Sequence, residues 1–424
     1  MSSDVLRQLV EFSLPKPCDF GEENFAGDDV VQSFCSRLTE ALGLEVSYFV
    51  SWACPPDVSV ISTPVGQAVV RSERLDTLLV EYHNLQRAHH VLDDSLATEV
   101  LASAALRWLS EFLIGYRQPG LALLAQRLRP KLDGLRWTSP FRDETLASIP
   151  ELERAALQCV CLAHEIGHLQ WPRRPEATLD HEFDGLPLAE HIAWGDRETS
   201  NSEQVLTALS KRWRAHLDAP TLVSEIEADL FSLYNVVEFQ CNVLGYSLEQ
   251  AFRATLRAFE AQLFVCMAKN TARLLVSSLQ CNTSKAEFLL EDYLLGTEYL
   301  ARARAVARRA GILWAIGEQP HAAPGTRQYD EYVRRIDALI IEVQPFTQLA
   351  SATLVRSAHL LFDTMASSRD RTREWLDKQF EILESDSRLR LDMFEILIAF
   401  GCPGSVDVTG YLRRMQSTTA VSTS

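Results

Sequence analysis

From about residue 84 to residue 400, apolar residues recur every three or four positions, and this periodicity restricts the fold more than any other feature of the chain. The spacing places apolar side chains on one face of an α-helix, and that face must then be buried against another element. We therefore expect a mainly α-helical protein. The expected helical segments are 95–117, 119–129, 149–170, 203–217, 221–240, 247–278, 285–311, 328–344, 346–367 and 370–399.

The first 85 residues have a different pattern, in which short β-prone runs alternate with turn signals such as Pro55-Pro56. The runs are 44–52, 58–62, 68–71 and 78–82, and they predict a small antiparallel sheet. The expected fold class is thus mainly α with a small N-terminal β element (α+β). We expect an N-terminal α+β region (1–145), a helical metal-binding catalytic region (146–345), a C-terminal helical region (346–416) and a disordered tail (417–424).

The formal net charge of −16 disfavours general binding to nucleic acid, because an acidic surface repels phosphate backbones. The one local concentration of basic residues comprises Arg302, Arg304, Arg308 and Arg309. Their spacing distributes them around a helix rather than along one stripe, so we interpret them as a solvated helix face.

The nine cysteines are odd in number and lie mostly among apolar residues, which favours reduced thiols over a disulfide framework. The first residues lack the basic and apolar regions of a signal peptide. No apolar run reaches the ~18 to 20 residues that span a bilayer. These features predict a cytoplasmic protein without a membrane span.

The chemistry of the chain is concentrated in residues 164–168, which read His-Glu-Ile-Gly-His. The host segment has the punctuation of a helix, since Ser148 and Glu151 can form a capping box and Pro172 follows the end. On a helix His164 and His168 lie one turn apart on the same face, so both imidazoles can reach one metal ion.

Glu165 projects from the position next to the first histidine. A carboxylate there can take a proton from a metal-bound water and later pass it to a leaving amine. Zinc lowers the pKa of its bound water from ~16 to about 7, which supplies hydroxide at neutral pH. The motif therefore predicts a zinc site with Glu165 as the general base.

A catalytic zinc site keeps three protein ligands and one open position, so a third ligand is needed. The strongest candidate is Glu225, which shares a helix face with Asp229 four residues later. Asp229 could then accept a hydrogen bond from a ligating imidazole and fix its tautomer. Glu227 points to the opposite side of that helix, but Glu227, His181 and His191 remain alternative ligands.

The combination of His-Glu-x-x-His with a downstream Glu-x-x-Ala-Asp resembles the gluzincin-type zincin metallopeptidases. The likeness spans residues 155–235 and is nearest to the CAAX-processing and HtpX-like proteases and to peptidases of the ImmA and IrrE type. The resemblance implies a zinc site between two core helices, with His164, His168 and Glu225 as ligands. It also implies that Glu165 is the general base in hydrolysis of a peptide or protein amide bond by zinc-activated water.

Two other classes of function remain open. A His-His-carboxylate set also suits non-haem iron, so an oxidative peptide-tailoring enzyme is an alternative. A regulatory or binding protein with a structural metal site is a second alternative, since the helical segment 245–400 offers a large surface for a protein partner. A donor to the transition state would come from His181, His191, His216 or Tyr234.

Overall fold

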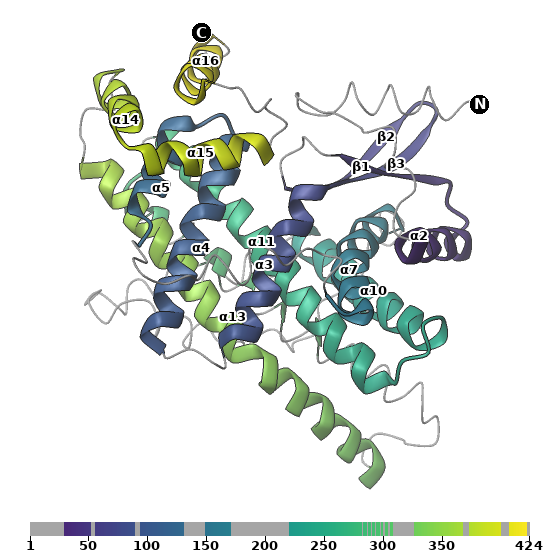
Figure 1. Ribbon diagram of the computed structural model, residues 1–424. Coiled ribbons are helices and arrows are strands. Elements are labelled where there is room, and N and C mark those ends of the chain that lie inside the picture. Colours follow the sequence, from purple (N-terminus) through teal and green to yellow (C-terminus); the bar gives the residue numbers. More distant parts are fainter. Residues whose placement is uncertain are drawn as a thin grey trace.

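The computed structural model describes residues 29–51, 56–89, 94–130, 149–170, 220–281, parts of 283–307, 326–367, 373–399 and 407–421. It is mostly helical, with one small sheet near the N-terminus, as the sequence predicts (Figure 1). The described helices are α2 (Asp29–Leu42), α3 (Glu73–His89), α4 (Asp94–Gly115), α5 (Pro119–Leu128), α7 (Glu151–Gln170), α10 (Pro220–Asn242), α11 (Leu248–Gln280), α13 (Arg327–Ser367), α14 (Arg373–Ser385), α15 (Ser387–Ala399) and α16 (Val408–Val421).

The sheet contains β1 (Val46–Ser51), β2 (Val58–Thr63) and β3 (Gly66–Ser72) in the order β1-β3-β2. The tight turn between β2 and β3 makes that pair antiparallel, as expected. The prediction of a wholly antiparallel sheet is wrong, however, because β1 pairs with β3 in parallel. Strand β3 is the most buried of the three and is the central strand. Because β2 pairs with one edge of β3, β1 pairs with the other edge.

The fourth predicted strand, residues 78–82, lies within helix α3. Leu75, Leu78, Leu79 and Tyr82 are all buried, at the three- and four-residue spacing of a helix face. In a short apolar run that is buried on several faces, polar and apolar residues do not alternate clearly. The sequence of such a run therefore fits both a strand and a helix.

Helix α13 also differs from the prediction, which divided it at Pro345 into two helices. The helix continues through the proline although the pyrrolidine ring removes one backbone donor. Val343 and Phe346 on either side are buried, as is Ala350 one turn later. Their burial stabilises a continuous helix against the local cost of the proline.

Among the helices that the structure describes, α13 alone is long and apolar enough to cross a bilayer by length and composition. This is weak support for a membrane span, because 59% of its most apolar stretch is buried inside the structure, as in the core helix of a globular protein.

The prediction of a disordered tail from residue 417 is wrong in part, because α16 extends to Val421. Val408 and Leu412 are buried and anchor the first turns of this helix. Once a helix is nucleated, adding residues is far easier than starting it, so the small polar residues that follow continue the helix.

Helix α7 packs against α10, α11 and α2 (Figure 1). Its residues from Ala155 to Ala163 are all buried. The sheet lies over the same helix, through contacts from β2 and β3. The His-Glu-Ile-Gly-His sequence therefore sits at the end of a helix that the core holds on several sides.

Candidate metal centre

Helices α7 and α10 form the most extensive helix pair in the described structure. The Ser232 hydroxyl donates to the carbonyl of Val160 at 2.7 Å, and the Gln240 amide donates to the carbonyl of Leu152 at 3.1 Å. Later residues of α10 thus contact earlier residues of α7, so the two helices run antiparallel. This arrangement brings the start of α10, with its acidic residues, to the histidine end of α7.

Gly167 sets how closely the two helices approach at that end. A Cβ atom on residue 167 would lie 3.2 Å from Cα of Ala228 and 3.2 Å from the Phe231 ring. Such contacts are tighter than ordinary packing allows, so even an alanine would require the neighbours to move. Gly167 and Ala228 are the small residues that let donors on the two helices converge.

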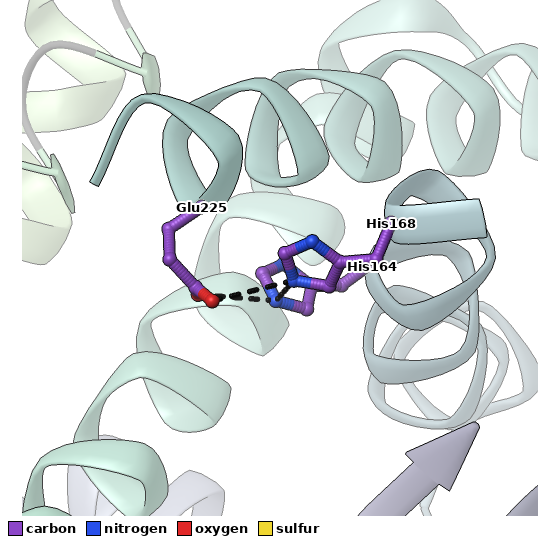
Figure 2. Close-up of side chains that lie close together, drawn as sticks. All are labelled: His164, His168 and Glu225. Carbon is purple, nitrogen blue, oxygen red and sulfur yellow. Dashed lines mark hydrogen bonds and ion pairs between the residues drawn. The ribbon is translucent and has the colours of Figure 1, made fainter. Parts of the chain in front are cut away.

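The side chains of His164, His168 and Glu225 meet at this point (Figure 2). The two imidazole Nε2 atoms are 3.1 Å apart. Glu225 Oε2 lies 3.4 Å from Nε2 of His164, and Glu225 Oε1 lies 3.4 Å from Nε2 of His168. Among the residues that the structure describes, this is the only group of three or more histidine, cysteine or acidic side chains arranged so that it could hold a metal ion.

The separations between these donor atoms fit a small tetrahedral ion. Ligand bonds of about 2.0 to 2.1 Å at tetrahedral angles place neighbouring donors about 3.3 Å apart. The two Nε2 atoms are 3.1 Å apart, and each lies 3.4 Å from one of the two oxygens of Glu225, so all three distances are close to this value. His168 and Glu225 keep 25% and 38% of their side-chain area exposed, so the cluster is open on one side.

Each imidazole is oriented by a second contact through its other ring nitrogen. His164 Nδ1 lies 2.9 Å from Oδ1 of Asp229, and His168 Nδ1 lies 3.2 Å from Oγ of Ser224. A proton on each Nδ1 would face Asp229 or Ser224 and would leave both Nε2 lone pairs directed into the cluster. This is the tautomer that ligation through Nε2 requires.

Arg302 completes the cluster, and the sequence did not identify it. Its guanidinium donates from Nε and Nη2 to the two carboxylate oxygens of Asp229, at 2.8 and 3.1 Å, and from Nη2 to Glu225 Oε2 at 3.0 Å. The expectation of a solvated basic face is wrong for this residue, which is only 3% exposed. Arg304, Arg308 and Arg309 lie outside the described residues.

The ionisable groups of the cluster favour a cation at its centre. Burial raises the pKa of Glu225, but contacts with both histidines and with Arg302 outweigh burial and hold the pKa well below its usual range. Burial lowers the pKa of His164, but the hydrogen-bonding contacts with Asp229 and Glu225 raise it to about 10. The surroundings thus stabilise positive charge at the point where the imidazoles and Glu225 meet.

Glu165 lies beside this cluster in partly buried surroundings. Burial raises the pKa of its carboxyl group above the usual range, while His164 opposes the rise and Asp57 adds to it. Lys269, which forms an ion pair with Asp57, is also close enough to act on Glu165 electrostatically. A carboxyl group with a raised pKa is suited to exchange protons near neutral pH.

The other candidates from the sequence do not join the described cluster. Glu227 is not among the three converging residues. Tyr234 is 43% exposed and lies nine residues beyond Glu225 on α10, which is about 13 Å along the helix. His181, His191 and His216 lie outside the described residues, as does the helix predicted at 203–217.

Six cysteines fall within the described residues, and all six are free thiols. They are Cys35, Cys159, Cys161, Cys241, Cys266 and Cys281. Burial raises the pKa of Cys266 to about 12 and that of Cys161 well above its usual range. These two thiols therefore stay protonated at neutral pH, a form that neither ligates metal nor reacts as a nucleophile.

Comparisons of the chain with models of protein families, with curated proteins and with solved structures gave no match.

Proposed function

We propose that this protein is a zinc-dependent metallopeptidase that hydrolyses an amide bond of a peptide or protein. Zinc would be held by Nε2 of His164 and His168 and by the carboxylate of Glu225. The observation that supports this most strongly is the set of three donor separations, which match the edges of a zinc tetrahedron. The open side of the cluster leaves room for a fourth ligand and for a substrate.

A bound zinc ion would supply a Lewis acid that polarises a carbonyl oxygen and acidifies a water molecule. The residues of the chain transfer the protons and orient the ligands. Glu165 accepts the proton of the attacking water and passes it to the nitrogen of the leaving amine, and its raised pKa suits both transfers. Asp229 and Ser224 hold the imidazoles in the ligating tautomer through both steps.

Replacement of Glu165 tests this mechanism. Glu165→Gln keeps the size of the side chain but removes the base, so we expect the metal content to stay unchanged and peptide hydrolysis to fall by about 10²- to 10⁴-fold. Metal can be measured by mass spectrometry of the purified protein, and cleavage with a library of quenched fluorescent peptides. Glu151→Gln, at the start of the same helix and exposed to solvent, is the matched control and should retain activity.

Full activity in Glu165→Gln would exclude this mechanism. Iron in the purified protein, together with a product that forms only in the presence of dioxygen, would assign the site instead to an oxidative enzyme with the same His-His-carboxylate ligands. A metal without any open coordination position would indicate a structural site.

A further inference from the structure

The guanidinium of Arg302 donates hydrogen bonds to both carboxylates of α10, those of Glu225 and Asp229. Its Nη2 group lies 3.0 Å from Glu225 Oε2 and 3.1 Å from Asp229 Oδ1, and its Nε lies 2.8 Å from Asp229 Oδ2. Asp229 uses both oxygens on Arg302, whereas Glu225 uses only Oε2. The other oxygen, Oε1, lies 3.4 Å from Nε2 of His168, and Oε2 also lies 3.4 Å from Nε2 of His164. The two oxygens of Glu225 are therefore not equivalent.

The guanidinium of Arg302 also contacts residues outside the cluster, which fix its position. Its Nη1 group donates to Glu298 at 3.3 Å, and its Cζ atom lies 5.4 Å from the centre of the Tyr299 ring. The Tyr299 hydroxyl accepts a hydrogen bond from Asn270 on α11 at 2.8 Å. Because Arg302 is 3% exposed, water cannot readily replace these partners. The position of the guanidinium is thus fixed by residues that do not belong to the cluster.

We propose that Arg302 is a positioning residue that restricts Glu225 to a single ligating oxygen. This inference rests on the proposed metal site. A carboxylate can bind a metal through one or both oxygens, and the second mode would occupy an additional coordination position. Because Arg302 donates to Oε2 and not to Oε1, Oε1 is the oxygen that is free to bind the ion. The site then keeps three protein ligands and the open position that catalysis by zinc needs.

Cobalt(II) provides a direct measure of this property, because it occupies zinc sites and its visible absorption is strong when four-coordinate and weak when the coordination number rises. We expect the protein loaded with Co²⁺ to show the strong four-coordinate bands. In Arg302→Gln both oxygens of Glu225 become available, and the molar absorptivity should fall severalfold at an unchanged ratio of one Co²⁺ per chain.

Arg302→Lys tests the same idea with the charge retained. A lysine ammonium lacks the planar fork and cannot hold both carboxylates at once, so the Co²⁺ bands should weaken here too, though less than in Arg302→Gln. Should Arg302→Gln fail to fold, the result with Arg302→Lys decides the question. The matched control is Arg71→Lys, which weakens the buried Arg71–Asp76 ion pair without touching the cluster and should leave the Co²⁺ spectrum unchanged.

Three results would overturn the inference. Bands of wild-type strength in folded Arg302→Gln and Arg302→Lys would show that Arg302 does not control the coordination number, while the metal site itself would stand. Loss of Co²⁺ binding in both variants would show that Arg302 is needed to form the site rather than to limit it. A wild-type protein that binds no Co²⁺ would overturn both this inference and the proposed function.

Discussion

Glu225 on α10 is partly exposed at the candidate metal centre, whereas Glu260 on α11 is buried in the helical core, and their surroundings give these two carboxyl groups opposite charge states. Contacts with two histidines and Arg302 hold the pKa of Glu225 well below its usual range. Burial raises the pKa of Glu260 to about 8, and its contact with Thr347 and the more distant Arg257 only partly oppose this. Glu260 is 1% exposed.

The two residues show that burial and contacts with charged groups have opposite effects on a carboxyl group. Burial alone leaves a carboxyl group neutral, as at Glu260, where the Thr347 hydroxyl donates to Glu260 and lies 3.2 Å from the Tyr82 hydroxyl. Glu225 stays ionised because hydrogen-bond donors and the cationic Arg302 converge on it.

The largest effect is expected from removing the ionised carboxylate. Glu225→Ala deletes one of three ligands, so the metal content of the purified protein should fall from one ion per chain to almost none. Glu260→Gln should leave the content unchanged, since that residue is not part of the cluster. If Glu225→Ala keeps its metal, the third ligand lies elsewhere, with Glu227, His181 and His191 as the remaining candidates.

A smaller loss of metal binding is expected from changing a residue that contacts a ligand but does not itself bind the metal. Asp229→Asn weakens the contact that orients His164, so the affinity for zinc should fall by about 10- to 100-fold, as measured by competition with a chelator. Asp292, which lies 3.0 Å from Nε2 of His359, forms a similar buried pair outside the cluster. Asp292→Asn is therefore the control, and equal losses in both variants would contradict a specific role for Asp229.

The neutral carboxyl group should be visible in the pH dependence of stability. The folded protein keeps the proton of Glu260 up to about pH 8, whereas an unfolded chain loses it near pH 4.5. The folded state thus binds more protons between these values, so this group makes stability fall as pH rises, by up to about 1.4 kcal/mol per pH unit.

Urea unfolding at several pH values can measure this slope. Glu260→Gln cannot titrate and should lack this component, so its stability relative to the wild type should improve steadily from pH 5 to pH 8. A constant difference over that range would mean that Glu260 is ionised in the folded protein, and the contrast with Glu225 would disappear.

The smallest expected effect concerns the spacing of the two helices. Gly167→Ala should lower the free energy of unfolding by about 1 kcal/mol, because overpacking against Ala228 and Phe231 costs more than the helix gains from alanine. Ala156→Gly, at a buried position on the same helix, is the comparison for propensity and cavity effects. A stabilised Gly167→Ala protein would show that the helices can separate without penalty.

Much of the fold and of the site could be predicted from the sequence, because both depend on local spacing. His164 and His168 are one helical turn apart, as are Glu225 and Asp229, so each pair shares a face whatever the rest of the chain does. The periodic segments likewise predicted most of the described helices. The exceptions are α13, the run at 78–82, the segment 370–399, which forms α14 and α15, and α16, which was not predicted.

Arg302 could not be predicted in this way. It lies 77 residues beyond Glu225, and arginine is usually exposed, so nothing local distinguishes a buried guanidinium from a solvated one. The parallel pairing of β1 with β3 was missed for a similar reason, since it depends on which strand the tertiary structure buries most. Features that depend on contacts between distant segments require the folded structure.

The close contact at Gly167 also affects how such sites are recognised from sequence. Signature patterns of the form His-Glu-x-x-His leave the fourth position free, as though only residues with reactive side chains carried information. Here that position is restricted by packing, because a Cβ atom on residue 167 would lie 3.2 Å from Cα of Ala228, on the helix that carries Glu225. A chain could therefore keep every ligand and the base, match the signature, and still fail to assemble the centre.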